Sequence, residues 1–209
     1  MELWIFLGAL AAAYLLPGPD MILVLQTGAL QGRSQAFATV AGLATARGLH
    51  VALAALGLAA LFQAAPWAFN VVRYVGAAYL IWMGVQILRS GPGLSADDTS
   101  KGLFAVSHRL AWRRGLLTNL LNPKSLLFCS VLLPQFVLPG QGSILAQFAL
   151  LGVLLVGTGV LFDTLYATTG TWLGQWLAGS SMRERLQRWT FASLLIGFGL
   201  RLATHRLPQ

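Results

Sequence analysis

Six apolar segments, each about long enough to cross a bilayer, follow one another along this chain. A transmembrane helix needs about 20 predominantly apolar residues, and a window of that length finds residues 3–26, 36–62, 67–88, 115–136, 144–165 and 189–203. Only 10% of the residues are charged, against about 25% in soluble domains, so the chain cannot cover a surface that faces water. We therefore expect an all-α integral membrane protein with six transmembrane helices. A topology with five spans or a re-entrant segment stays open.

The basic residues indicate how these helices are oriented. They follow the first, third and fifth segments, as Arg33, then Arg89, Lys101, Arg109, Arg113 and Arg114, then Arg183, Arg185 and Arg188. The links after the second and fourth segments carry no Lys or Arg. Because Lys and Arg concentrate in cytoplasmic loops, this alternation places the odd-numbered links in the cytoplasm and the N-terminus outside. It explains the net charge of +8 without a nucleic-acid partner, although Arg201 and Arg206 would then lie outside.

A long link divides the six segments into two sets of three. Residues 89–114 contain the stretch SGPGLSADDTSKG, whose polar and turn-forming residues predict a flexible cytoplasmic link. We expect a single membrane domain, residues 1–209, with halves 1–100 and 101–209. Because three is an odd number, the second half enters the membrane upside down relative to the first.

Each half begins with a segment that prolines interrupt. The first contains Pro-Gly-Pro-Asp at 17–20, within LLPGPDMILVL, and the fourth contains Asn-Pro-Lys at 122–124, within NLLNPKSLLFCSVLLPQF. Each motif follows a Leu-rich run at the corresponding place in its half. The pattern predicts two inverted three-helix repeats, in which helices 1 and 4 of the six are broken inside the membrane.

The first motif has the chemistry of a helix that stops and restarts. Pro17 and Pro19 have no N–H, so the carbonyls of Ala13 and Leu15 lose their helical partners. Pro19 fits the first position of a new helix. Asp20 then lies in the first turn, where the helix dipole favours a negative charge.

The second motif predicts the same arrangement. Asn122 is expected to cap a helix that starts at Pro123, which leaves the carbonyl of Asn119 free. With both restarts near the middle of the membrane, two positive helix ends face a shared space, and such ends bind carboxylates. Gly18 and Lys124 join the residues above as candidates for this site.

Few titratable side chains lie inside the predicted spans. Asp20, His50 and Asp163 are candidates for carrying protons, since each can titrate in a membrane cavity. His50 could instead be a hydrogen-bonded packing residue. Arg47 lies nearly one helical turn before His50, and a charge pair with Asp163 would be a plain structural role for it. Lys124 could pair with Asp20, bind a substrate carboxylate or extend toward the cytoplasm.

Three blocks of the chain resemble the LysE/RhtB amino-acid exporters of bacteria. They are PGPDMILVLQTGALQGRSQAFATVAGLATARGLH, VRYVGAAYLIWMGVQILR and GLLTNLLNPKSLLFCSVLLPQF, and the resemblance extends across nearly the whole chain. It implies a multi-pass protein of the bacterial inner (plasma) membrane that exports amino acids or close derivatives, driven by the proton motive force. It also implies site roles for the Pro-Gly-Pro-Asp and Asn-Pro-Lys motifs. Ala46 and Arg47 depart from the family pattern of a glycine followed by an acidic or small polar residue. We therefore expect an acidic or neutral amino acid rather than lysine.

The expected mechanism is secondary active export by proton antiport. The substrate carboxylate meets the helix N-termini and Lys124, the ammonium group meets Asp20 and freed backbone carbonyls, and protonation of Asp20 outside favours release. The partners are then an amino acid, protons and the lipid bilayer. A homodimer stays open, because glycine faces can pack within one chain or between two.

Other classes of function fit the residues less well. An exporter of another small metabolite or of a cation is the main alternative. No cofactor or metal is expected, because Cys, His and carboxylates do not cluster. An enzyme is not expected, because the Asp residues form no set with a nucleophile and a base. A passive channel or scaffold leaves the matched helix breaks unexplained.

Overall fold

The structure consists of helices and short connections. This computed structural model describes residues 3–57, 65–89, 107–138, 140–177 and 181–204. In chain order the elements are α1 (Leu3–Leu15), α2 (Pro19–Gln31), α3 (Arg33–Ala55), α5 (Pro66–Arg89), α6 (His108–Leu120), α7 (Pro123–Leu127), the π-helix η2 (Phe128–Leu132), the 3₁₀-helix η3 (Leu133–Phe136), α8 (Ile144–Leu177) and α9 (Ser181–Thr204). No strand occurs in these ranges, in agreement with the all-α prediction.

Both predicted helix breaks are present, and they bend the chain equally. The turn between α1 and α2 and the turn between α6 and α7 each give a bend of 56°. Pro19 and Pro123 take the first position of the restarted helices, where no N–H is required. Asn122 caps α7 as expected, because its side-chain oxygen accepts the backbone N–H of Lys124 at 3.0 Å. Gly18 is the N-cap of α2 and supplies no side-chain cap.

The second broken helix changes its hydrogen-bond pattern beyond α7. Pro134 has no N–H and cannot bond to the carbonyl of Ser130 as an α-helix requires. The chain forms a π turn instead, in which the N–H of Leu133 donates to the carbonyl of Phe128 five residues earlier. A 3₁₀ turn follows and ends at Phe136.

The helix α6 starts within the predicted long link. Ser107 caps this helix, and its hydroxyl accepts the N–H of Leu110 at 3.2 Å. A side-chain oxygen at this position satisfies one of the unpaired N–H groups of a helix start. Residues 108–114 are therefore helical, whereas residues 90–106 of the link lie outside the described ranges.

Glycines let the helices pack in close pairs. A Cβ atom on Gly42 of α3 would lie 2.0 Å from the carbonyl oxygen of Trp112 in α6, and one on Gly115 of α6 would lie 2.2 Å from that of Thr39 in α3. Gly170 and Gly174 bring α8 equally close to α2. Such contacts are typical of helices in membranes, where small residues allow backbones to approach.

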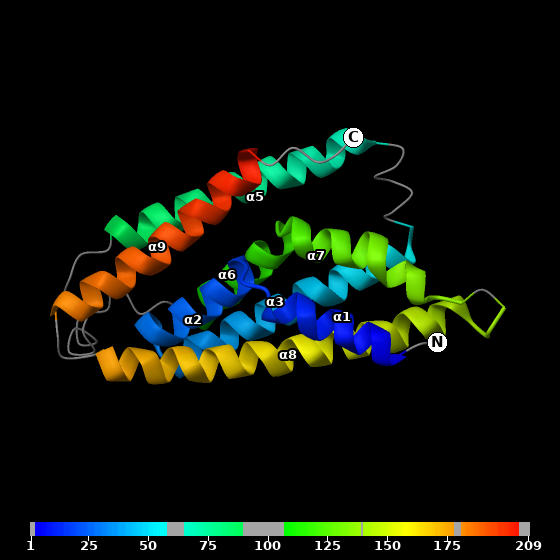
Figure 1. The fold of residues 1–209 in the computed structure, drawn as a ribbon, viewed down its shortest axis with the longest axis horizontal. Coiled ribbons are helices and arrows are strands. Elements are labelled where there is room, and N and C mark those ends of the chain that lie inside the picture. The colour runs from blue at the N-terminus through cyan, green and yellow to red at the C-terminus, as the bar shows by residue number, and fades with distance from the viewer. Residues whose placement is uncertain (1–2, 58–64, 90–106, 139, 178–180, 205–209) are drawn as a thin grey trace.

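The buried apolar residues form clusters that combine helices from before and after the long link. One cluster joins α1, α3, α8 and the η2–η3 segment, and another joins α2, α3 and α8. A further cluster packs α5 and α9 onto α2. In Figure 1, α5 and α9 lie side by side across the top of the view and α8 runs along the bottom. The broken helices lie between them.

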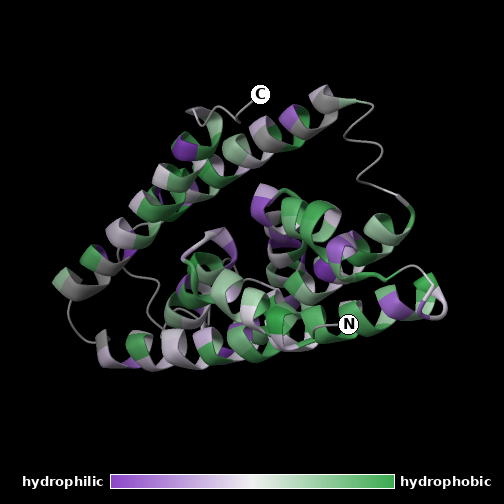
Figure 2. Ribbon diagram, turned by 45° about the vertical axis from the view of Figure 1, so that its right-hand side comes forward, coloured by the Kyte–Doolittle hydropathy of each residue, from purple (hydrophilic) through white to green (hydrophobic). Residues whose placement is uncertain are grey.

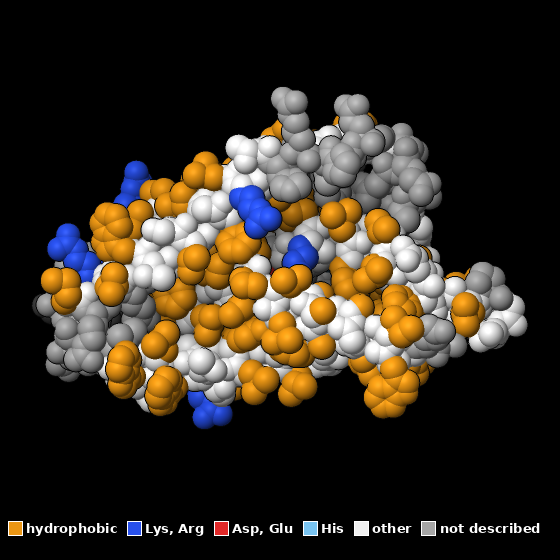
Figure 3. Space-filling view, viewed as in Figure 1, with side chains coloured by type: hydrophobic (Ala, Val, Ile, Leu, Met, Phe, Trp, Pro, Cys, Tyr) orange, Lys and Arg blue, Asp and Glu red, His pale blue; other side chains and the backbone are white. Residues whose placement is uncertain are grey.

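The outer surface is apolar. Trp4, Leu145 and Val153 expose 87%, 72% and 70% of their surface, which hydrocarbon can cover and water cannot. Figure 2 shows apolar residues along the length of the helices, and Figure 3 shows them covering much of one face, with few Lys or Arg side chains. Within the described residues, α3, α5 and α8 are long and apolar enough to cross a membrane, and each bent pair adds a further candidate span.

Five of the six predicted spans thus have a counterpart among these candidates, and the sixth is not confirmed. The helix α9 is absent from the candidate spans. It starts at Ser181, whereas the predicted sixth span starts at residue 189. Its first turns contain Arg183, Glu184 and Arg185. The helix α8 contains the predicted fifth span and continues past residue 165 to Leu177. The polar stretch after residue 165 remains helical where its glycines pack against α2.

Candidate functional site

A cavity lies where the two helix breaks meet. Gly18, Asp20 and Met21 from the first break line it together with Asn122, Lys124 and Ser125 from the second, and α1, α3, η2 and α8 complete the wall. The space open to the centres of water molecules is about 50 Å³. One water needs about 10–15 Å³ by this measure, so the cavity admits only a small solute.

The structure sorts the predicted site residues into three groups. Gly18, Asp20, Asn122, Lys124, Arg47 and Asp163 line the cavity. Pro17, Pro19 and Pro123 are not among the lining residues and shape the breaks instead. Asn119 and His50, at 0% and 1% exposure, lie behind the wall.

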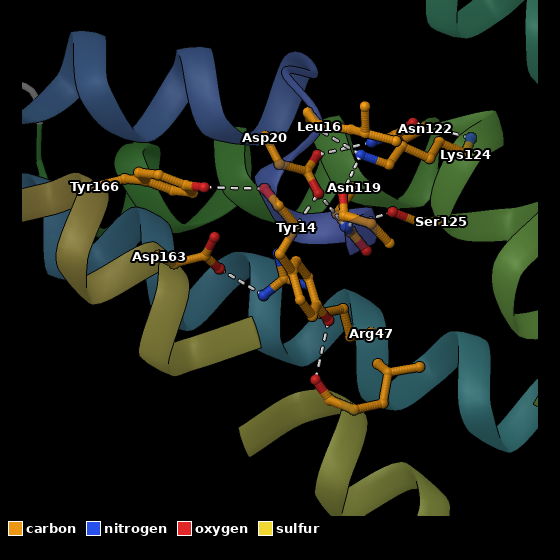
Figure 4. Close-up of polar contacts among 12 residues, drawn as sticks. Tyr14, Leu16, Asp20, Arg47, Asn119, Asn122, Lys124, Ser125, Asp163 and Tyr166 are labelled. Carbon is orange, nitrogen blue, oxygen red and sulfur yellow. Dashed lines mark hydrogen bonds and ion pairs between the residues drawn. The ribbon is translucent and has the colours of Figure 1, made fainter. Parts of the chain in front are cut away.

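Asp20 of α2 is held by amides from the other break. Its Oδ2 accepts a hydrogen bond from Asn119 Nδ2 at 2.5 Å, and its Oδ1 accepts one from Asn122 Nδ2 at 3.1 Å. The Asn119 amide also donates to Ser125 Oγ at 2.9 Å. Figure 4 shows these amides pointing toward the carboxylate. The carboxylate is thus fixed in position, with 15% of the Asp20 side chain still exposed.

Lys124 of α7 reaches in the opposite direction, to the end of α1. Its Nζ donates hydrogen bonds to the carbonyls of Ala13 and, at 3.0 Å, of Leu16. The carbonyl of Ala13 is the one that Pro17 frees, so the lysine replaces the missing N–H. The Ala13 carbonyl, one of the freed carbonyls expected to meet a substrate ammonium group, thus already has a donor within the chain. A cation is also favourable at the C-terminal end of a helix, because the dipole is negative there.

The carbonyl of Asn119 is likewise not free. It accepts the backbone N–H of Asn122 at 3.0 Å, because the chain tightens by one residue before the break. The carbonyl of Leu120 is hydrogen bonded to the ring of His50. His50 therefore completes the end of α6 from α3, while its Nδ1 has no partner among the described residues.

Arg47 and Asp163 form a buried charge pair between α3 and α8. Arg47 Nη1 lies 2.5 Å from Asp163 Oδ2, and the two residues are 2% and 1% exposed. Removing one partner of a buried pair typically costs roughly 3–5 kcal/mol, since the other charge is left without compensation. Arg47 Nη2 also lies 3.6 Å from Asp20 Oδ2, so this pair is electrostatically connected to the cavity carboxylate.

Two tyrosines that are absent from the sequence-based predictions complete the framework. Tyr14 donates its hydroxyl to the carbonyl of Leu155 at 2.9 Å, and its ring lies under the Arg47 guanidinium, 5.0 Å from ring centre to Cζ. Tyr166 donates to the carbonyl of Tyr14 at 2.9 Å, which satisfies another carbonyl at the end of α1. A tyrosine inside an apolar helix could have indicated a hydrogen bond to another helix, because its hydroxyl needs a partner when buried.

No metal site is found in the parts of the chain that the structure describes, since no three His, Cys, Asp or Glu side chains come together there. The cavity instead combines carboxylates, an ammonium group and a guanidinium group. These are the groups that recognise a small charged or zwitterionic solute.

The model of the family described as LysE type translocator matches residues 11–206. The chain belongs to this family. The match confirms the resemblance seen in the three sequence blocks and places the protein among transporters. Together with its apolar helices, it makes this LysE-family protein a multi-pass bacterial membrane protein.

Several relatives of this LysE-family protein cover nearly its full length. It is 34% identical to the homoserine/homoserine lactone efflux protein of Salmonella typhimurium. The aligned 190 residues cover 91% of this chain and 90% of that protein. It is 27% identical to the leucine efflux protein of an Enterobacter species, over 98% of this chain and 96% of that protein. An uncharacterized membrane protein of Vibrio cholerae is 30% identical over 98% of each chain. No solved structure matches the chain.

Proposed function

We propose that this LysE-family protein exports a small neutral amino acid, or a close derivative, from the cytoplasm in exchange for protons. The observation that carries the proposal is the cavity between the two helix breaks, whose wall holds two carboxylates and two cations. The named relatives support it, because homoserine and leucine are both neutral amino acids.

The charges of the cavity favour a zwitterion. Asp20 and Asp163 balance Arg47 and Lys124, so the ionised wall has no net charge. A zwitterion adds none, whereas a lysine or a glutamate substrate would leave an uncompensated charge in a poorly hydrated space. The earlier expectation included acidic substrates because of Arg47. Because Arg47 is paired with Asp163, its charge is already compensated, and we restrict the proposal to neutral amino acids.

Free hydrogen-bonding capacity indicates how the substrate is oriented. A carboxylate offers about four acceptor positions, and Asn119 and Asn122 occupy two on Asp20, so the substrate ammonium group takes the remainder. A lysine has three N–H donors, and Lys124 uses two on α1. The third is available to the substrate carboxylate. The N-terminus of α2, which lacks a side-chain cap, adds backbone donors.

Transport across the membrane requires the site to open on alternate sides. We assign α1–α2, α3 and α5 to one repeat, in residues 1–100, and α6–η3, α8 and α9 to the other, in residues 101–209. The long link stays in the cytoplasm. The equal bends of the two broken helices and the close packing of α9 on α5 support an inverted six-helix arrangement. In such transporters the repeats rock around a site near the midplane.

Proton entry would drive export through a titratable side chain at this site. Asp20, Asp163 and His50 are the candidates. The direct scheme places the proton on Asp20, where it abolishes the charge that holds the substrate ammonium group. The inner membrane supplies the proton gradient for this step.

Counterflow in proteoliposomes tests the function. Vesicles containing the purified protein would be loaded with unlabelled L-homoserine or L-leucine and diluted into the labelled compound. We expect saturable uptake of label that an imposed proton gradient drives above equilibrium, and that Asp20→Asn abolishes. Absence of exchange for every amino acid by monodisperse, folded protein would contradict the proposed function. Gradient-driven export retained in Asp20→Asn would remove Asp20 from the site.

A further inference from the structure

Arg47 lies between two carboxylates and contacts them unequally. One guanidinium nitrogen, Nη1, is hydrogen bonded to Asp163, whereas the other, Nη2, lies 3.6 Å from Asp20 Oδ2. Figure 4 shows the guanidinium between Asp163 and the Asp20 cluster. A contact about 0.7 Å shorter would give an ordinary N–H···O hydrogen bond of 2.9 Å. Arg47 can therefore exchange its carboxylate by a small side-chain movement.

The donor that faces Asp20 is unsatisfied in this state. Nη2 is buried and has no hydrogen-bond partner among the described residues. An unpaired buried donor costs free energy, which is greater for a charged group. While Nη1 is bonded to Asp163, Nη2 has no hydrogen bond. A movement of the guanidinium toward Asp20 would give Nη2 a hydrogen bond to the Asp20 carboxylate.

Tyr14 and Gly159 shape the surroundings of the Arg47 guanidinium. The ring of Tyr14 supports one face of the guanidinium, and the hydroxyl of this tyrosine is fixed to Leu155. On α8, a Cβ atom at Gly159 would lie 2.7 Å from Arg47 Nη1. The absence of a side chain at Gly159 therefore creates the space in which Arg47 reaches Asp163.

We propose that Arg47 is a positioning residue shared between the two carboxylates: bound to Asp163 it leaves Asp20 to the substrate ammonium group, and when Asp163 takes up a proton it moves onto Asp20 and displaces that group. The proposal rests on the proposed function and replaces the direct protonation of Asp20 by an indirect step. The proton binds to an Asp163 carboxylate oxygen and takes the place of the arginine N–H. The substrate leaves as an intact zwitterion.

Several charged or titratable groups face these carboxylates. Arg47 from α3, Asp20 from α2, Tyr14 from α1 and Tyr166 from α8 act on Asp163. Arg47, Lys124, His50, Tyr14 and Asp163 interact with Asp20. Of these, only Arg47 lies within ion-pair distance of both carboxylates in the described residues. Arg47 is thus the group through which protonation of Asp163 changes the charge environment of Asp20.

Substrate binding as a function of pH tests this inference in full-length protein. Labelled L-homoserine or L-leucine, whichever the unchanged protein exchanges, would be bound to protein in nanodiscs at alkaline and acidic pH. Asp163→Asn mimics the protonated state. We expect it to weaken binding at alkaline pH by at least about fivefold, the lower end of typical coupling between sites, and to remove the pH dependence. In the double variant Arg47→Gln/Asp163→Asn, binding should recover relative to Asp163→Asn and remain independent of pH.

Two glycine variants that change no charge test the positioning role of Arg47 in a second way. They remain informative if Asp163→Asn fails to fold. Gly159→Ala places a Cβ atom 2.7 Å from Arg47 Nη1, the nitrogen bonded to Asp163, and 2.7 Å from the Tyr14 hydroxyl. Loss of the contact with Asp163 should release Arg47 to Asp20 and weaken substrate binding. Gly157→Ala, on the same helix with nothing within 4 Å of the added Cβ atom, should bind as the unchanged protein does.

Each outcome bears on the inference. Tight binding by Asp163→Asn or by Gly159→Ala would overturn it, as would a double variant whose affinity still falls on acidification. A structural charge pair alone predicts that last result, because the proton would then act elsewhere. If the unchanged protein exchanges no amino acid, the proposed function fails first. If it exchanges one but Asp163→Asn binds normally, only the inference fails.

Discussion

Asp20 and Lys124 occupy the same position in their respective helices, directly after the proline that starts each one, and each side chain bonds to the opposite break. Asp20 of α2 accepts hydrogen bonds from Asn119 and Asn122. Lys124 of α7 donates to Ala13 and Leu16 at the end of α1. Each break is therefore stabilised by a side chain from the other, and residues of both breaks line the cavity.

Replacing Lys124 by Met should destabilise the protein as well as impair transport. The carbonyls of Ala13 and Leu16 would lose their donor. The cost arises at the partly buried Ala13 carbonyl, because an unsatisfied buried acceptor costs about 1–3 kcal/mol. Thermal unfolding in detergent measures the loss. Arg109→Met, at an exposed position at the start of α6, is the control and should unfold like the unchanged protein. Unaltered stability of Lys124→Met would show that α1 ends without help from α7.

A pair of glycine substitutions on α3 should have different effects. Gly42→Ala places a Cβ atom 2.0 Å from a backbone oxygen of α6, so the two helices must separate, and this should lower both the unfolding temperature and transport. Gly48→Ala meets nothing within 4 Å. It should be neutral or stabilising by up to about 1 kcal/mol, because alanine favours a helix over glycine. Equal behaviour of the two variants would mean that α3 and α6 do not pack as described.

Substitutions of His50 separate a structural role from proton transfer. His50→Gln keeps a donor for the carbonyl of Leu120 but cannot titrate near neutral pH. It should be stable and should still accumulate substrate when a proton gradient is imposed. His50→Leu leaves the carbonyl unpaired and should unfold at a lower temperature. Loss of gradient-driven transport in a stable His50→Gln protein would instead identify the imidazole as a proton carrier.

Exchange of one proton for one zwitterion should move net charge. Each cycle of export brings one positive charge into the cell, so a membrane potential that is negative inside should accelerate efflux. Proteoliposomes loaded with labelled L-homoserine or L-leucine, with the potential set by potassium and valinomycin, measure this rate. A rate that responds to the pH gradient but not to the potential would require a second charge to be carried outward with the substrate.

The helix breaks could be predicted from sequence because their cause is local. A proline removes a specific N–H, and the carbonyl that it leaves unpaired can be named by counting four residues back. Asn122 as a cap follows from the same local rules. The long apolar segments were predictable for a similar reason, since the bilayer sets their length.

The partners of the freed groups could not be predicted, because they depend on how distant segments pack. Lys124 bonds to the carbonyl of Leu16, 108 residues away in the chain. The roles expected for this lysine from the sequence were a pair with Asp20, a contact to the substrate carboxylate and an extension toward the cytoplasm. None of these roles supplied a donor to the end of α1. The pair of Arg47 and Asp163 was among the alternatives, because two buried opposite charges have a strong reason to meet. The roles of Tyr14 and Gly159 appear only once α1 and α8 are seen to pack around the guanidinium.

The π turn at Phe128–Leu132 has a consequence for how related chains should be compared. A π turn holds one residue more than the α-helical path it replaces, and one residue rotates a helix by about 100°. A relative that keeps α-helical bonding through this stretch would therefore align with a gap of one residue there. Phe128 and Cys129, which line the cavity, lie at that point. Single-residue length differences between family members at this place thus mark a change in which side chains face the solute.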